Sequence, residues 1–194
     1  LPYYVRKQTN VQSKENIASK IAELIQDGDH IMLDASSTAV YVIKRIKQLK
    51  NITIITNSIE ILLELADVTG WKVFSTGGTM KEGALALVGH QAEDMIDHFH
   101  VDKAIISCKG IDREYGITDS NESDVEIKRH MVRASRQVIL AVDSSKFDKI
   151  SFVRMGAFDQ IDQIVTDSIP QKTWVEYMEQ LGVEILCPEK EGAR

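Results

Sequence analysis

Short groups of polar and charged residues recur directly after apolar runs of this chain, and such groups suit the binding of an anion or of hydroxyls. The first group, Asp34-Ala35-Ser36-Ser37-Thr38, follows the apolar run 31–33. Hydroxyls and backbone N–H groups at a helix start attract an anion, because the helix dipole and its unpaired donors point outward. The same residues could act only as a helix cap. No glycine lies in this turn, so we expect hydroxyls rather than a close backbone cradle to be the donors.

Two similar groups follow the next apolar runs. The amide of Asn57, in Thr56-Asn57-Ser58, can hydrogen-bond a sugar hydroxyl, although Asn and Ser are also good helix caps. The pair Gly77-Gly78 allows a backbone to lie against a ligand, or forms only a turn. Each group alone is compatible with a purely structural role.

Cations appear in three more groups. Lys109 and Asp112 follow a long apolar run and suit a phosphate and a hydroxyl respectively, with a surface salt bridge as the alternative. Asp143-Ser144-Ser145-Lys146 follows the most hydrophobic run and predicts a second anion site, with a capped turn as the alternative. Asp124 and Lys128 are four residues apart, so they share a helix face and predict either an ion pair or a ligand contact.

Alternating strands and helices must position these groups. Helices are predicted near residues 13–25, 39–49, 59–66, 88–99, 125–136 and 174–181, and buried strands near 31–33, 52–56, 71–76, 101–107, 138–142, 161–166 and 183–186. This alternation predicts an α/β fold with a mostly parallel central sheet flanked by helices. The carboxyl ends of parallel strands meet at one edge, so the polar groups should converge there. We divide the chain into a linker or arm (1–12), one domain (13–188) and a tail (189–194).

Composition limits the partners of this chain. Its 194 residues carry a formal net charge of −6, and its basic residues are scattered, whereas a DNA-binding surface is usually basic. The two cysteines, Cys108 and Cys187, lie in apolar runs and predict buried free thiols, with no spacing typical of a metal site. No apolar run is long enough to span a membrane and no signal peptide is apparent, so we expect a cytoplasmic protein without metal or cofactor.

In this order and spacing the groups resemble the sensor domain of the DeoR family of transcription regulators, from about residue 13 to residue 188. The resemblance rests on Asp27-Gly28-Asp29, Leu33-Asp34 with its Ser/Thr loop, Thr56-Asn57-Ser58, Gly77-Gly78, Leu85-Ala86-Leu87-Val88-Gly89, Asp102-Lys103-Ala104, Gly110-Ile111-Asp112, Lys128-Arg129 followed by Met131, Asp143-Ser144-Ser145-Lys146-Phe147 and Ile164-Val165-Thr166-Asp167. Two positions depart from the family pattern: Ser37 stands where a glycine is usual, and Asp124 where a glutamate is common.

The resemblance implies a fold similar to ribose-5-phosphate isomerase, glucosamine-6-phosphate deaminase and the CoA transferases. It implies that the domain binds a phosphorylated sugar or related metabolite, and that binding alters the DNA affinity of a repressor. DNA would be contacted only by an N-terminal winged helix-turn-helix, which this sequence does not contain. We therefore expect the sensing part of a larger regulator, without contact to membranes, that assembles as a homo-oligomer, a dimer or a tetramer.

The predicted effector-binding residues combine these groups, and no catalytic residue or metal ligand is predicted. They are Asp34, Ser36, Ser37, Thr38, Asn57, Gly77, Gly78, Lys109, Asp112, Lys128, Asp143 and Lys146. One alternative is a sugar-phosphate isomerase or deaminase on the same fold, with Asp112, Glu126 or Asp143 as its base. Another is an oligomerisation domain with a vestigial pocket. The motifs match the regulators better than the enzymes, so a sensor is favoured and an enzyme is not.

Overall fold

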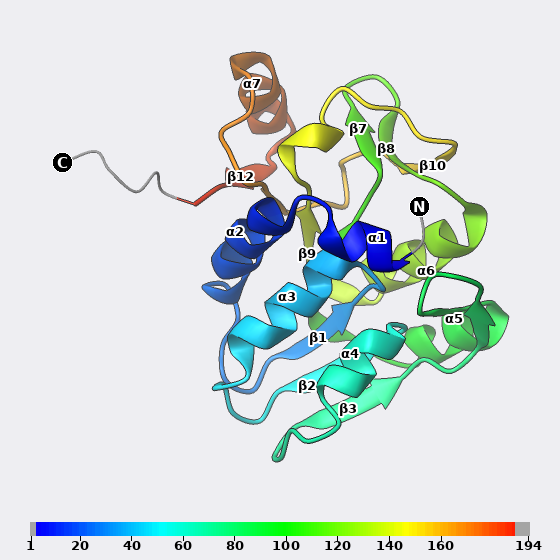
Figure 1. Ribbon diagram of the computed structural model, residues 1–194. Coiled ribbons are helices and arrows are strands. Elements are labelled where there is room, and N and C mark those ends of the chain that lie inside the picture. Colours follow the sequence, from blue (N-terminus) through cyan, green and yellow to red (C-terminus); the bar gives the residue numbers. More distant parts are fainter. Residues whose placement is uncertain (1–2, 189–194) are drawn as a thin grey trace.

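The computed structural model describes residues 3–188 and is built around one large parallel sheet (Figure 1). The order of its strands is β12-β11-β9-β6-β1-β2-β3, and every neighbouring pair is parallel. Their bounds are β1 His30–Leu33, β2 Thr53–Thr56, β3 Lys72–Ser75, β6 Val101–Ser107, β9 Ser135–Ala141, β11 Gln163–Val165 and β12 Glu184–Leu186. The predicted α/β fold with a parallel central sheet is confirmed.

Helices cover both faces of this sheet, and side chains alternate between the two faces along each strand. The helices are α1 Tyr3–Gln8, α2 Val11–Ala22, α3 Ser37–Ile46, α4 Ile59–Glu64, α5 His90–Asp97, α6 Glu122–Arg133 and α7 Lys172–Leu181. In β1, Ile31 and Leu33 pack in the core that α2, α3 and α4 share, whereas Met32 packs in the core under α5 and α6. Both faces are buried, which is why these strands appear in the sequence as continuous apolar runs.

Two smaller sheets extend the fold beyond the carboxyl ends of the main strands (Figure 1). One is antiparallel, in the order β10-β8-β7, and the other is the hairpin β4-β5. Their bounds are β4 Thr79–Lys81, β5 Ala86–Val88, β7 Gly110–Asp112, β8 Gly116–Asp119 and β10 Val153–Gly156, with a short 3₁₀ helix η1 at Ser144–Lys146. None of these elements was predicted from the sequence.

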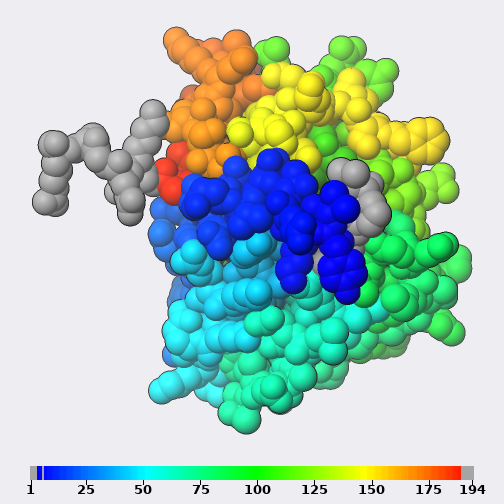
Figure 2. Space-filling model, in the orientation of Figure 1, coloured from blue at the N-terminus to red at the C-terminus, as the bar shows by residue number. Residues whose placement is uncertain are grey.

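The N-terminal residues differ from the sequence prediction. The second helix begins at Val11 rather than near Ser13, and residues 3–8 form a helix of their own where no regular structure was expected. Asn10, between the two helices, has a left-handed backbone with φ 52°. Figure 2 shows this segment lying across one face of the molecule. Residues 1–2 of the predicted arm and the predicted tail 189–194 lie outside the described residues.

Candidate functional site

A cavity of about 620 Å³ lies at the carboxyl ends of β1, β6 and β9. The loops that follow these three strands, the β4-β5 hairpin and the start of α2 all contribute to its wall. The lining residues are Thr9, Asn10, Lys14, Ser36, Ser37, Thr38, Lys81, Glu82, Gly83, Ala84, Ser107, Cys108, Lys109, Ser120, Asp124, Ala141, Asp143, Lys146 and Ser151. The polar groups therefore converge at one sheet edge, as the parallel topology predicts.

The N-terminus of α3 forms one wall of this cavity. Ser36 caps the helix, because its Oγ accepts a hydrogen bond from the Ala39 N–H at 3.1 Å. Ser37 and Thr38, in the first turn, line the cavity. The positive end of a ten-residue helix thus faces the cavity, together with two side-chain hydroxyls. The first turn of α3 is therefore capped by Ser36 and can also attract an anion.

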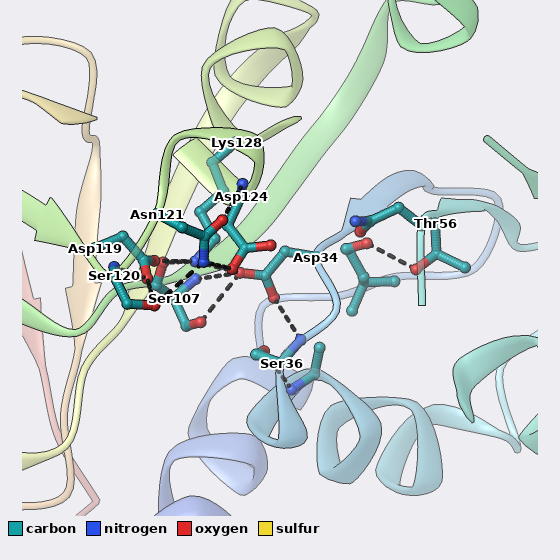
Figure 3. Close-up of polar contacts among 12 residues, drawn as sticks. Asp34, Ser36, Thr56, Ser107, Asp119, Ser120, Asn121, Asp124 and Lys128 are labelled. Atoms are coloured by element: carbon teal, nitrogen blue, oxygen red, sulfur yellow. Dashed lines mark hydrogen bonds and ion pairs between the residues drawn. The ribbon is translucent and has the colours of Figure 1, made fainter. Parts of the chain in front are cut away.

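A buried ion-pair network lies beneath the cavity (Figure 3). The Lys128 Nζ donates to Asp119 Oδ2 at 2.5 Å and to the Ser107 carbonyl at 2.7 Å, and lies 3.4 Å from Asp34 Oδ2. Asp34 Oδ2 also accepts from the Ser107 N–H at 2.8 Å and from its Oγ at 3.1 Å. The three protons of the Lys128 ammonium are directed at these protein acceptors.

The charges in this network reinforce each other. Burial alone would lower the pKa of Lys128, but the carboxylates of Asp119 and Asp34 outweigh burial and raise it above its ordinary value. Burial alone would raise the pKa of Asp119, but the Lys128 ammonium outweighs burial and lowers it. Lys128 therefore stays protonated and Asp119 ionised throughout the neutral range, as a fixed internal ion pair.

Of the two alternatives predicted for Asp124 and Lys128, the ion pair between them is wrong. Asp124 Oδ2 instead accepts from Lys81 Nζ at 2.6 Å and from Asn121 Nδ2 at 2.7 Å. Asn121 is the N-cap of α6, and its Oδ1 accepts the Asp124 N–H. The carboxylate is turned toward the β4-β5 hairpin and closes one side of the cavity.

A small recess of about 30 Å³ adjoins the cavity. Its residues come from the loop after β1, the turn after β2, the end of β6 and its following loop, the hairpin, the end of β8 and α6. They are Asp34, Ala35, Ser36, Asn57, Ala84, Ala86, Ser107, Lys109, Asp119, Asp124, Ile127 and Lys128. Asn57 is 2% exposed and its Nδ2 donates to the Leu87 carbonyl at 2.9 Å.

Cys108 also lines the cavity, at the end of β6. It is 5% exposed, and burial raises the pKa of its thiol to about 12. Both cysteines are free, as predicted. Cys187 is partly exposed rather than buried, so the prediction of two buried thiols holds only for Cys108.

The predicted site residues fall into three groups. Those that line the cavity are Ser36, Ser37, Thr38, Lys109, Asp143 and Lys146, of which Ser36 and Lys109 also reach the recess. Those that line only the recess are Asp34, Asn57 and Lys128. Those that line neither are Gly77, Gly78 and Asp112.

Gly77, Gly78 and Asp112, which line neither the cavity nor the recess, lie at turns between strands. Gly77 and Gly78 connect β3 to β4, and a Cβ on Gly78 would lie 2.6 Å from the Val88 carbonyl oxygen. Asp112 Oδ1 accepts from the N–H groups of Glu114 and Tyr115, both at 2.9 Å, in the β7-β8 hairpin. The local turn accounts for Asp112, and the close approach of the Val88 carbonyl accounts for the glycine at position 78.

Several lining residues were missed by sequence reasoning, above all Asp119, Ser107 and Lys81. Asp119 ends β8, a four-residue strand with no apolar run to mark it, and Lys81 belongs to a three-residue strand. Ser107 ends a predicted strand, but it carries no charge, so its residue type did not indicate a binding role. A search for every polar residue at a strand end would have found Ser107.

Within residues 3–188 no three His, Cys, Asp or Glu side chains are grouped so that they could hold a metal ion. Nor does any helix there have the length and apolar character needed to cross a membrane.

The main parallel sheet and its covering helices define an α/β domain with a fold of the ribose-5-phosphate isomerase type. In fold it is similar to ribose-5-phosphate isomerase A from Methanocaldococcus jannaschii, with a TM-score of 0.51 and 16% identity over 72% of this chain and 55% of that chain. It is also similar to eIF2B delta from Chaetomium thermophilum, with a TM-score of 0.53 and 14% identity over 83% of this chain and 57% of that chain.

Sequence similarity identifies the family. The model of the DeoR C terminal sensor domain matches residues 9–168, so the chain belongs to the DeoR family of transcription regulators and is its effector-sensing part. The HTH-type transcriptional repressor GlcR of Bacillus subtilis is 34% identical over 99% of this chain and 74% of its own length. The glycerol-3-phosphate regulon repressor of Escherichia coli is 28% identical over 96% of this chain and 74% of its own length. The resemblance inferred from the sequence is confirmed.

Proposed function

We propose that this domain binds a sugar phosphate or a related polyol phosphate in the cavity, and that binding changes the DNA affinity of the regulator to which the domain belongs. One observation carries the proposal: the cavity presents anion-binding groups in its wall and carboxylates in the adjoining recess. The anion-binding groups are the α3 N-terminus and the ammonium groups of Lys109 and Lys146. The carboxylates are those of Asp34, Asp119 and Asp124.

This arrangement suits a molecule with a negative charge and several hydroxyls. A phosphate accepts hydrogen bonds from Ser37, Thr38 and Lys146, whereas a sugar hydroxyl donates to a carboxylate. The name of one relative, the glycerol-3-phosphate regulon repressor, agrees with this class of ligand. The name of another, the L-fucose operon activator of Haemophilus influenzae, 32% identical to this chain, mentions a sugar without a phosphate.

The proposed signal passes through the junction of α1 and α2. Thr9 and Asn10, at this junction, line the cavity with Lys14, whose Nζ donates to the Thr9 carbonyl at 2.7 Å. Lys7 in α1 also forms an ion pair with Glu60 in α4. A ligand that favours one orientation of α1 shifts the populations of the states that differ there. The N-terminal segment 1–12 is thus the proposed link to a DNA-binding part.

The alternative of an isomerase or deaminase is less well supported. Of its three candidate bases, Asp112 holds a turn, and Glu126 pairs with Arg129 at 2.5 Å. Asp143 lines the cavity but accepts hydrogen bonds from the N–H and Oγ of Ser145, as the cap of η1. We therefore propose a cytoplasmic sensor without catalysis, which assembles as a homo-oligomer; light scattering on the purified protein tests the last point.

Thermal unfolding against a panel of phosphates tests the proposal. The panel is glycerol 3-phosphate, ribose 5-phosphate, fructose 6-phosphate and glucose 6-phosphate, with inorganic phosphate for comparison. A ligand at 100 times its Kd adds about 2.7 kcal/mol of stability, which for a domain of this size raises the Tm by roughly 5–11 °C. Lys146→Ala should remove most of this rise, and the exposed Lys172→Ala should keep it. If no sugar phosphate shifts the Tm, the proposal is wrong.

A further inference from the structure

We propose that the recess beside the cavity binds one uncharged hydroxyl of the effector, and that Asn57 Oδ1 is the acceptor that selects it. This inference rests on the proposed function and specifies its ligand: a polyol phosphate whose hydroxyl lies at a fixed distance from the phosphate. It follows from an unpaired buried acceptor, from the size of the recess and from its charges.

The unpaired acceptor is the first observation. Among the described residues, two buried side-chain oxygens have no hydrogen-bond partner, Asn57 Oδ1 and Glu60 Oε2. Leaving such an atom without a partner is costly, so a buried acceptor of this kind normally has a donor in the functional state. Asn57 lines the recess, and a ligand there supplies that donor.

The orientation of the Asn57 amide is fixed by its neighbours. Its Nδ2 donates to the Leu87 carbonyl at 2.9 Å, and its own backbone carbonyl accepts the Leu87 N–H at 2.8 Å. Turning the amide over would bring its oxygen against the Leu87 carbonyl oxygen, two acceptors without a proton between them. The atom left for a ligand is therefore the oxygen, and the matching ligand group must be a donor.

The size of the recess limits what enters. A volume of about 30 Å³ holds one water-sized group, because a bound water needs roughly 10–15 Å³ of space of this kind. A hydroxyl oxygen fits, and a phosphate with its four oxygens does not. Before the ligand binds, a water molecule is the expected occupant, and the ligand hydroxyl displaces it.

The charges of the recess exclude an anion. Three carboxylates line it, those of Asp34, Asp119 and Asp124, against the two ammonium groups of Lys109 and Lys128. The Lys128 ammonium is directed at Asp34, Asp119 and the Ser107 carbonyl, so it is already paired within the protein. A negative ligand group would add to this excess of carboxylates over cations, whereas a hydroxyl can donate to Asn57 and still accept from a neighbouring donor. The phosphate is thereby assigned to the outer cavity, with the α3 N-terminus and Lys146.

A comparison of hydroxyl and deoxy ligands tests this inference. Calorimetry first identifies the strongest binder of the panel above, and then compares it with each of its monodeoxy analogues on wild type, Asn57→Ala and Thr76→Ala. Thr76 is the matched control, since it also follows a strand and is 3% exposed, but lines neither space. We expect one analogue to bind wild type about tenfold more weakly than its parent, because one hydrogen bond is lost.

On Asn57→Ala, the parent should lose the same factor of about tenfold, and that analogue should lose nothing more. Inorganic phosphate should bind wild type and Asn57→Ala equally, and Thr76→Ala should behave as wild type. If the parent binds Asn57→Ala as tightly as wild type, the recess inference is wrong while the proposed function stands. If no sugar phosphate binds wild type, the proposed function fails and the recess inference fails with it.

Two further experiments keep the inference testable if Asn57→Ala does not fold. Wild type is crystallised with the strongest binder, and Asn57→Ser, which removes less volume, replaces the alanine variant in calorimetry. The inference requires a ligand hydroxyl within hydrogen-bond distance of Asn57 Oδ1. A complex in which the recess holds water, or in which the phosphate occupies it, overturns the inference.

Discussion

Removal of the Lys128 charge tests whether the network beneath the cavity organises the site. Lys128→Met keeps most of the side-chain volume but leaves Asp34 and Asp119, each 1% exposed, without their counter-ion. Breaking one partner of a buried ion pair costs about 3–5 kcal/mol. For a domain of this length that corresponds to a fall in Tm of roughly 6–20 °C. Urea unfolding followed by circular dichroism at pH 7 measures the free energy directly.

The control for this variant is Lys172→Met. Lys172 lies in α7, where its Nζ is 3.4 Å from Glu176 and its side chain is 88% exposed. An exposed pair of this kind contributes little, so the control should unfold almost as wild type does. The double variant Lys128→Met/Asp119→Asn should recover part of the loss, because it removes one of the two stranded carboxylates.

The loss should also depend on pH in a direction set by the pKa shifts. The pKa of Asp119 is lowered from 3.8 in the folded protein, so its stabilising contribution is present above pH 3.8 and is lost as the pH falls through the lower folded value. The pKa of Lys128 is raised from 10.5, so its contribution is present below pH 10.5 and is lost only as the pH rises through the higher folded value. The cost of Lys128→Met should therefore be largest near neutral pH and shrink at pH 3.5. A cost under about 1 kcal/mol at pH 7, well below the range for a buried pair, would refute this reasoning.

Three further predictions concern the cavity wall. A thiol reagent at pH 8 should modify Cys187 but not Cys108 until urea unfolds the protein, because the pKa of Cys108 is about 12 and its side chain is buried; equal rates in the native state would contradict this. Asn10→Gly should speed hydrogen exchange in α1 and weaken the effect of the ligand on it, since glycine adopts many backbone conformations besides the left-handed one. Asn51→Gly, at a second left-handed asparagine that does not line the cavity, should leave exchange in α1 as in wild type. Lys109→Ala should change the rank order of affinities in the phosphate panel, and an unchanged order would exclude Lys109 as a specificity determinant.

The main sheet was predictable because its strands are covered on both faces. Residues 104–106 and 138–142 appear as continuous apolar runs for that reason, and their length excludes a helix of ordinary size. The antiparallel strands were not predictable by the same rule. β8 has the sequence Gly116-Ile117-Thr118-Asp119, too short and too mixed to show a period, and it is buried only because β7 and β10 pack beside it. Such burial is a property of tertiary contacts and leaves no local pattern.

The site shows the same division between local and distant contacts. The positions of Ser36 and Ser37 followed from a helix start, which is a local feature. The partner of Lys128 could not be predicted in this way. The spacing of four residues along a helix favoured Asp124, whereas the structure places Asp119, from β8, against Lys128.

This exchange of partners has a consequence for the ligand. If Lys128 paired with Asp124, its ammonium would lie at the cavity wall and could hold the phosphate. Because it pairs with Asp119 and Asp34, it neutralises the base of the recess, and the recess remains rich in acceptors. The phosphate is then left to Lys146, Lys109 and the α3 N-terminus on the outer side. Inorganic phosphate affinity should therefore fall in Lys146→Ala and stay unchanged in Asn57→Ala, which separates the two ends of the site in a single titration.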